Sequence, residues 1–233
     1  GLSYVNVRRD ASGVTLRVMQ GGEPVEVTAD HLVSTAGRRA NTNSMGLDEV
    51  GVKTDARGSI VIGDDMQTSV PGIYAAGDVT DRDQFVYMAA YGAKLAVKNA
   101  ILGDDQRYDN SDMPWVVFSD PQVAGVGLSE QQARDAGFDV KTSVVPLDQV
   151  PRALAARDTR GLIKLVADRA TDKLLGGQII APEGSDTIQT LVMALKFSMT
   201  TKDLGAYLTT VEGLKLAAQT FDMDVAKLSC CAG

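Results

Sequence analysis

The chain has 233 residues, of which 44% are hydrophobic and 23% are charged, and its formal net charge is −7. This composition is typical of a packed globular protein and excludes an intrinsically disordered chain. The scattered Lys and Arg form no basic stripe for nucleic acid, and no run reaches the roughly 20 apolar residues that cross a bilayer. The first residues lack a secretory signal pattern, so we expect a cytoplasmic protein with no nucleic-acid or membrane partner.

The first residues predict a small β-meander followed by a buried strand. Alternating apolar residues at Leu2–Val7, Val14–Met19 and Pro24–Val27, separated by glycines, predict three short strands. Leu32–Ala36 is typical of a buried strand that ends in a tight turn at Gly37. No G-x-G-x-x-G motif occurs in the sequence, although a complete dinucleotide-binding domain opens with one. We therefore expect the amino-terminal part of such a domain to be missing.

The middle of the chain predicts short strands and then a long helix. Turn residues separate three short apolar runs, which predict strands at Val52–Thr54, Ile60–Ile62 and Ile73–Ala76. Closely spaced apolar residues then predict a largely buried helix over Asp83–Leu102 that is stopped by Gly103.

The last part of the chain predicts a separate α+β layer. A polar stretch over residues 104–112 marks a boundary. A helix capped by Ser129, with Gln132 three residues on, and helices over Asp186–Phe197 and Val211–Phe221 interrupt a group of strands. Such grouping favours a mostly antiparallel sheet. The predicted strands are Trp115–Phe118, Ala124–Leu128, Val140–Pro146, Leu162–Val166 and Leu174–Ile180.

Two positions in the middle of the chain are candidates for binding a ligand. Gly77 and Asp78 follow a predicted strand, at the edge where open α/β sheets bind ligands, and glycine lets a ligand approach the backbone. A plain turn aspartate is the alternative for such a pair. Val86 lies in the first turn of the predicted helix, where backbone N–H groups have no helical acceptor.

The only two cysteines, Cys230 and Cys231, are adjacent and lie near the end of the sequence. An adjacent pair is no framework for a secreted disulfide fold. Neighbouring thiolates are ligands for soft metal ions, and a chain end is suited to carrying such an ion. An incidental pair or a labile disulfide is the alternative.

Three segments together resemble the mercuric reductases of the pyridine nucleotide-disulfide oxidoreductase family. They are Val33–Thr42, Thr68–Asp78, and Leu214–Phe221 with the tail Leu228–Gly233. The resemblance implies an α/β with α+β fold: the end of a two-dinucleotide-domain flavoprotein, followed by an α+β dimerisation domain with a mostly antiparallel sheet. It implies a remnant of the NAD(P)H-binding domain over 1–41, the carboxyl-terminal part of the FAD-binding domain over 42–108, and the dimerisation domain with a metal-binding tail over 109–233.

The resemblance also implies roles for particular residues. Asp78 would accept a hydrogen bond from a ribityl hydroxyl of FAD, and Val86 would contact the flavin through its backbone. Tyr207 would be the catalytic residue that lines the metal site. Cys230 and Cys231 would bind Hg(II) and deliver it to the partner subunit of a homodimer. The implied activity is reduction of Hg(II) to Hg(0) by NAD(P)H through FAD and cysteine thiolates. We expect this chain alone to be inactive, because it lacks a C-x-x-x-x-C pair.

Two other functions are open. A dihydrolipoamide dehydrogenase-like disulfide reductase is opposed by Tyr207, which stands where such enzymes have a histidine; the only histidine, His31, is expected to be a structural strand residue. A non-catalytic dimerisation and metal-binding fragment is the other alternative. The segment before Tyr207 is shorter than in relatives by about four residues, roughly one helical turn, which shifts the expected position of Tyr207.

Overall fold

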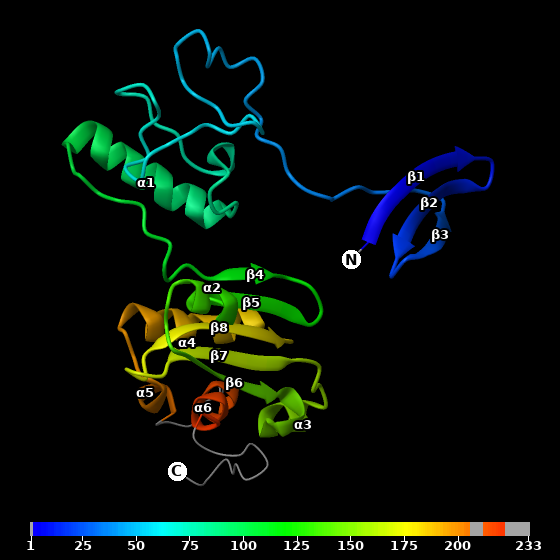
Figure 1. Ribbon diagram of the computed structural model, residues 1–233, viewed down its shortest axis with the longest axis vertical. Coiled ribbons are helices and arrows are strands. Elements are labelled where there is room, and N and C mark those ends of the chain that lie inside the picture. Colours follow the sequence, from blue (N-terminus) through cyan, green and yellow to red (C-terminus); the bar gives the residue numbers. More distant parts are fainter. Residues whose placement is uncertain (1, 206–211, 222–233) are drawn as a thin grey trace.

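The computed structural model describes residues 2–205 and 212–221. In chain order these residues form a β-meander, a loop-rich segment that ends in a long helix, and a five-stranded sheet covered by helices (Figure 1). An extended stretch of chain leads from the meander to the loop-rich segment (Figure 1).

The meander is the antiparallel sheet that the sequence predicts. Its strands are paired in the order β1-β2-β3. Val14 and Val18 of β2 are buried, whereas β1 is exposed along its whole length. The bounds are β1 (Leu2–Asp10), β2 (Gly13–Gln20) and β3 (Glu23–Ala29).

The predicted strand at Leu32–Ala36 is wrong. This stretch has no regular structure, and the side chains of Leu32 and Val33 are 47% and 81% exposed. A strand needs a hydrogen-bonded neighbour, and within the described residues neither sheet contains this stretch. His31 was expected in a strand, and it instead lies exposed beyond the end of β3.

The loop-rich segment does not form the full strands that the sequence predicts. The expected strands are reduced to isolated bridges, which pair Thr54 with Ile60, Ile62 with Thr68, and Gln67 with Tyr74. A small core of Met66, Leu95 and Ala96 packs this segment against the long helix.

The long helix α1 spans Val86–Leu102 and ends at Gly103, which has the left-handed conformation (φ 70°) expected of a helix terminator. It begins later than the predicted Asp83. Phe85 is extended (φ −126°) and Asp83 has a positive φ of 25°, so neither residue has helical backbone angles.

The last part of the described chain is an antiparallel sheet in the order β4-β5-β8-β7-β6. The five predicted strands and the predicted helices are confirmed, with ends that shift by a few residues; two further short helices, α3 and α5, were not predicted. The strands are β4 (Trp115–Val117), β5 (Gln122–Gly127), β6 (Val140–Pro146), β7 (Leu162–Asp168) and β8 (Leu174–Ala181). The helices are α2 (Glu130–Asp135), α3 (Pro151–Ala156), α4 (Gly184–Lys196), α5 (Thr201–Gly205) and α6 (Glu212–Gln219).

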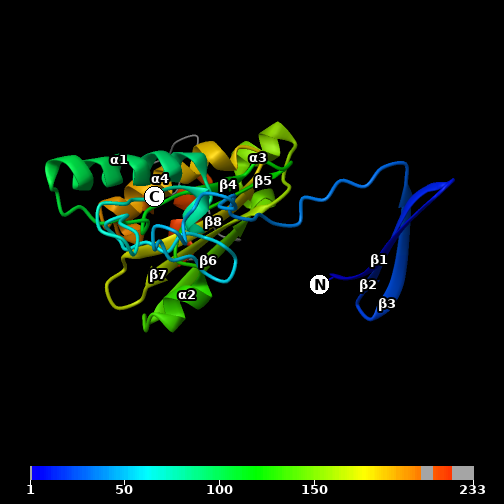
Figure 2. The same ribbon diagram turned by 90° about the horizontal axis from the view of Figure 1, so that it is seen from above.

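One face of this sheet carries the main core. Helix α4 packs on β5 and β8, and helix α6 packs on β6 and β7. Leu165 and Ile179 of the sheet, Leu191 of α4 and Leu214 of α6 are all within 1% of complete burial. Helix α2 covers the opposite face (Figure 2), and its start is held by the predicted capping box of Ser129 and Gln132.

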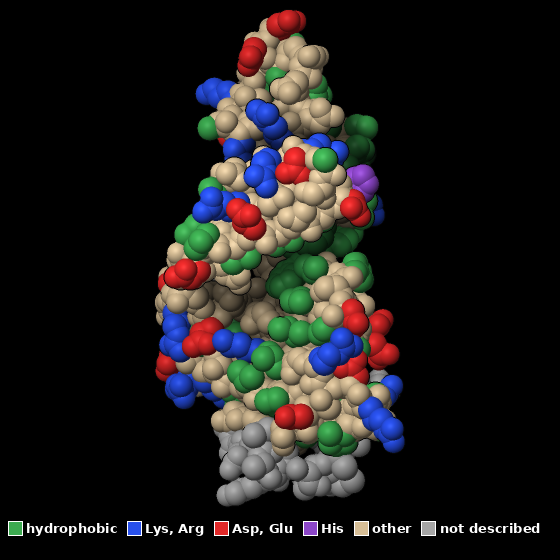
Figure 3. All heavy atoms as spheres, turned by 90° about the vertical axis from the view of Figure 1, so that its right-hand side faces the viewer, with side chains coloured by type: hydrophobic (Ala, Val, Ile, Leu, Met, Phe, Trp, Pro, Cys, Tyr) green, Lys and Arg blue, Asp and Glu red, His purple; other side chains and the backbone are tan. Residues whose placement is uncertain are grey.

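The surface is mixed in charge. On the face in Figure 3, Lys and Arg side chains alternate with Asp and Glu, and hydrophobic side chains are exposed between them. No helix within the described ranges combines the length and the apolar character that crossing a membrane requires.

Removal of the Leu191 side chain tests the main core. Leu191 is 0% exposed, whereas Met193 on the same helix is 43% exposed. We expect Leu191→Ala to lower the free energy of unfolding by about 2–5 kcal/mol, because it leaves a cavity that the sheet cannot fill. Met193→Ala is the matched control, with a change within about 0.5 kcal/mol. Urea unfolding followed by fluorescence of the single tryptophan, Trp115, measures both; equal losses would contradict this account of the core.

Candidate functional site

Gly77 brings the backbone close to helix α1 and sets the position of Asp78. Its angles, φ 80° and ψ −159°, belong to a region that essentially only glycine adopts. A Cβ atom at this position would lie 2.9 Å from the Cβ of Ala89 on α1. The Thr80 hydroxyl donates a hydrogen bond to the Gly77 carbonyl at 2.8 Å. Asp78 therefore begins a short 3-10 turn (Asp78–Thr80) that is fixed beside the first turns of α1.

The Asp78 carboxylate is paired with Arg38, which is 40 residues away in the sequence. The Nη1 group of Arg38 donates to Oδ2 of Asp78. The side chains are 60% and 47% exposed respectively, so the pair contributes little to stability. A carboxylate can accept several hydrogen bonds, so Asp78 keeps acceptor capacity for a hydroxyl group of a ligand.

The amino end of α1 is open to solvent. The Phe85 side chain makes no capping hydrogen bond, and Val86 is 84% exposed. The N–H groups of Met88 and Ala89 both donate to the Phe85 carbonyl at 3.0 Å. Those of Val86 and Tyr87 precede any helical acceptor, as in the first turn of every helix. This end of α1 can therefore donate to an acceptor atom, and the helix dipole favours partial negative charge there.

Asp83 fixes the chain just before α1 through several hydrogen bonds. Its carboxylate accepts hydrogen bonds from the Tyr108 hydroxyl at 3.0 Å and from Nδ2 of Asn110 at 2.7 Å. Its carbonyl accepts from the Phe85 N–H at 2.6 Å. Burial, together with the hydrogen bond to Asp83, raises the pKa of Tyr108 above its usual value, so the phenol stays protonated and donating.

Two ion pairs also hold the loop between Asp78 and α1. Arg57 contacts Asp81 at 2.8 Å, and Arg82 contacts Asp64 at 3.0 Å. The Arg82 guanidinium also lies over the Tyr108 ring, 5.5 Å from its centroid. These contacts tie the loop between Asp78 and α1 to the bridges of the loop-rich segment.

An apolar hollow of about 330 Å³ runs along α1 near this site. Val97 and Ile101 beside it are 56% and 74% exposed. An exposed apolar face of this kind marks a surface that other protein atoms or a ligand can cover. The residues that line the hollow are Tyr74, Ala75, Ala76, Ala93, Ala96, Val97, Ala100 and Ile101.

The structure brings some of the predicted site residues together and leaves others outside. Asp78 and the start of α1 with Val86 lie in one region, and Arg38 joins them, which sequence reasoning missed because an arginine in a loop resembles a solvated surface charge. Tyr207, Cys230 and Cys231 lie outside the described residues. Within residues 2–205 and 212–221, no group of three or more His, Cys, Asp or Glu side chains is placed to hold a metal ion.

The fold and this site define a class of protein. A loop-rich segment with a fixed glycine-aspartate turn beside a helix amino end is followed by an antiparallel α+β domain. Residues 2–96 match the model of the pyridine nucleotide-disulphide oxidoreductases, and residues 113–211 match the dimerisation domain of the same family. The chain belongs to the pyridine nucleotide-disulphide oxidoreductase family.

Within that family the chain is similar to mercuric reductases, which confirms the resemblance found in the sequence. It is 46% identical to the enzyme of Bacillus cereus over 100% of this chain and 38% of that protein. It is 48% identical to that of Shigella flexneri over 100% of this chain and 41% of that protein. The chain spans between 38% and 49% of the length of the curated relatives that it matches.

Solved structures confirm the fold class. LpdA from Mycobacterium tuberculosis superposes with a TM-score of 0.80 at 26% identity, over 95% of this chain and 49% of LpdA. The HOCl-induced flavoprotein disulfide reductase RclA from Escherichia coli, solved as a Cu(II) complex, superposes with a TM-score of 0.79 at 24% identity. That match covers 94% of this chain and 50% of RclA, and it bears on the fold alone.

Substitution of Gly77 tests the close approach to α1. Gly77→Ala places a methyl group 2.9 Å from Ala89 and forces alanine into a backbone region of high energy. We expect it to destabilise the packing of α1 by about 1–3 kcal/mol, seen as faster amide hydrogen exchange over residues 86–102. Gly72→Ala is the control: its φ of +83° is positive as well, but nothing lies within 4 Å of an added Cβ. If both variants leave exchange in α1 unchanged, Gly77 does not fix this contact.

Proposed function

We propose that this chain is the carboxyl-terminal portion of a mercuric reductase. The complete protein would convert Hg(II) and NAD(P)H into Hg(0), NAD(P)⁺ and a proton. One observation carries the proposal: similarity to mercuric reductases covers the whole chain, including the tail that contains two adjacent cysteines. The proposed division is a remnant of the NAD(P)H-binding domain over 1–41, the end of the FAD-binding domain over 42–108, and a dimerisation domain with its tail over 109–233.

The residues around Asp78 fit a flavin. The half-exposed Asp78 carboxylate would accept a hydrogen bond from a ribityl hydroxyl, and Arg38 would keep the carboxylate oriented. The free N–H at Val86, in the exposed first turn of α1, would donate to a carbonyl of the flavin ring. FAD, when bound, supplies two-electron transfer between NAD(P)H and the thiolates that hold the metal. The apolar hollow along α1 would be covered by the remaining part of the FAD-binding domain.

The tail with Cys230 and Cys231 would bind and transfer Hg(II). Two adjacent thiolates bind a soft ion such as Hg(II) strongly, and the ion displaces their protons on binding. In a homodimer, which the match to the dimerisation domain supports, Cys230 and Cys231 of one subunit would pass Hg(II) to the active site of the other. Tyr207 would line that site as the catalytic residue contributed by this chain.

Mercury binding by the tail is the direct test. Cys230 and Cys231 are the only thiols in the chain. We expect the chain to bind one equivalent of Hg(II) per subunit with loss of both titratable thiols. We expect the Cys230→Ala/Cys231→Ala variant to lose this binding, because soft thiolate ligands are then absent. Ser229→Ala, which changes the neighbouring hydroxyl and keeps both thiols, should bind normally. Unchanged Hg(II) uptake by the double variant would remove the tail from the mechanism.

The activity of the chain alone is a second test. The 233 residues contain no G-x-G-x-x-G loop to hold the FAD phosphates and no C-x-x-x-x-C pair to receive electrons. We therefore expect the purified chain to show no flavin absorbance and no Hg(II)-dependent oxidation of NADPH. A complete mercuric reductase assayed in parallel is the positive control. Clear turnover by the chain would contradict the proposal that it is a portion, whereas mercury binding without turnover would fit it.

A further inference from the structure

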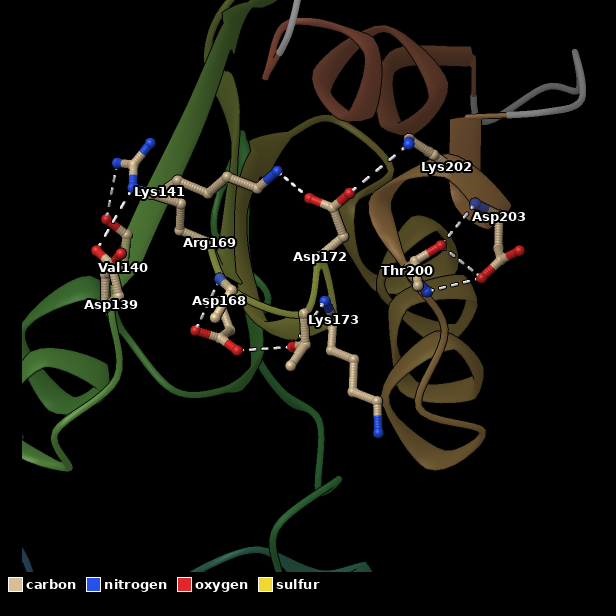
Figure 4. A network of polar contacts seen from close by, with 12 residues as sticks. Asp139, Val140, Lys141, Asp168, Arg169, Asp172, Lys173, Thr200, Lys202 and Asp203 are labelled. Atoms are coloured by element: carbon tan, nitrogen blue, oxygen red, sulfur yellow. Dashed lines mark hydrogen bonds and ion pairs between the residues drawn. The ribbon is translucent and has the colours of Figure 1, made fainter.

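Lys141 of β6 contacts both the turn between β7 and β8 and the residue Phe221 that follows α6. Its side chain is only 13% exposed. Its ammonium group donates to the carboxylate of Asp172, in the turn between β7 and β8. Figure 4 shows the Lys141 side chain directed at Asp172, with Lys202 approaching the other carboxylate oxygen at 4.0 Å. The same ammonium lies over the ring of Phe221, 5.1 Å from its centroid.

A second side chain of β6 holds the same end of α6. Ser143 is 3% exposed, and its hydroxyl is hydrogen-bonded to the carbonyl of Ala217 and to the hydroxyl of Thr220. Residues at i and i+2 of a strand point to the same face of a sheet. Lys141 and Ser143 are therefore neighbouring contacts that fasten the end of α6 onto β6.

Asp172 connects this contact to α5. Its backbone is in the left-handed conformation (φ 61°), and its carbonyl accepts the N–H of Thr201 at 3.0 Å, at the start of α5. The hydrogen bond from Lys141 holds the pKa of Asp172 below its usual value, so the carboxylate stays charged opposite the ammonium. A nearly buried ammonium requires such a partner, because an unpaired charge away from water is costly.

Helix α5 and Phe221, which Lys141 connects, each precede in the sequence a segment that is proposed to contact the metal. In the sequence, α5 is followed by residues 206–211, which include Tyr207. Phe221 is followed by residues 222–233, which include the cysteine pair. One ammonium group thus contacts, on one side, the turn that holds α5 and, on the other side, the residue from which the tail continues.

We propose that Lys141 is a positioning residue: through Asp172 and the Phe221 ring it fixes the two points from which the chain continues toward Tyr207 and toward the cysteine pair. Its metal-related role rests on the function proposed above, whereas the anchoring itself does not. Among the described residues, loss of the ammonium leaves the Asp172 carboxylate with Lys202, 4.0 Å away, as its one cationic partner, and leaves the Phe221 ring without its cation.

Lys141→Met tests the anchor, because methionine keeps an unbranched apolar side chain and removes the charge. We expect amide hydrogen exchange over residues 212–221 to become about 5–30-fold faster, since a desolvated cation–π contact and a paired charge are lost. Exchange over β7 should stay unchanged. Lys141→Arg keeps a cation and should restore slow exchange. Lys196→Met is the matched control: it removes an exposed ion pair to Asp112, 3.0 Å long, from the same domain.

A distance measurement separates positioning from simple stabilisation. Spin labels are placed at Cys231 in a Cys230→Ser background and at Gln131→Cys, an exposed position on α2. We expect pulsed EPR to give a broader distance distribution with Lys141→Met than with Lys141→Arg or Lys196→Met. An unchanged width overturns the proposal, as does a general increase of exchange that includes β7. Neither readout uses Hg(II) or flavin, so a tail that fails to bind mercury counts against the proposed function and leaves the anchor standing.

Discussion

The structure depends on the burial of one face of the five-stranded sheet under α4 and α6. Leu165 and Ile179 lie on that face, and Leu191 and Leu214 are pressed onto it from the helices. Each side chain removed from water stabilises the fold by about 1.5–3 kcal/mol. The contact is close: a Cβ added at Gly177 of β8 would lie 2.5 Å from Cδ1 of Leu191. Because α6 is held in this way, the chain beyond it starts from a defined place on the domain.

The loop-rich segment is stabilised differently. Its buried hydrophobic cluster is small, with Met66, Leu95 and Ala96, and the ion pairs around Asp78 and Asp81 are exposed. Val52, Ile60 and Met88 are buried outside this cluster. An apolar hollow lies along α1, and most of the other residues of this helix are also open to water. The site at Asp78 therefore relies on the close approach of Gly77 to α1 and on polar contacts of the loop. This arrangement suits one wall of a site that other protein atoms complete.

Sequence patterns predicted the elements whose partners are close in the chain or whose two faces differ. The capping box at Ser129 and the stop at Gly103 are local signals, since a few adjacent residues satisfy them. Strands β7 and β8 are joined by a short turn and form an antiparallel pair. Leu32–Ala36 has an equally apolar pattern, but a strand also requires a neighbour, and the pattern cannot supply one. The short helices α3 and α5 contain too few residues for periodicity to identify.

The amino-acid sequence by itself determined the family, the antiparallel character of the last domain and the chemical identity of the candidate ligands, because these depend on residue type and local spacing. It identified Asp78 and the start of α1 as candidates, yet it left Arg38 and Lys141 as ordinary charges. Only the tertiary structure decided their partners, because ion pairs between residues 40 or 31 positions apart form only after the backbone has brought them together. The sequence shows which residues are charged, and folding determines which of them come close enough to form ion pairs.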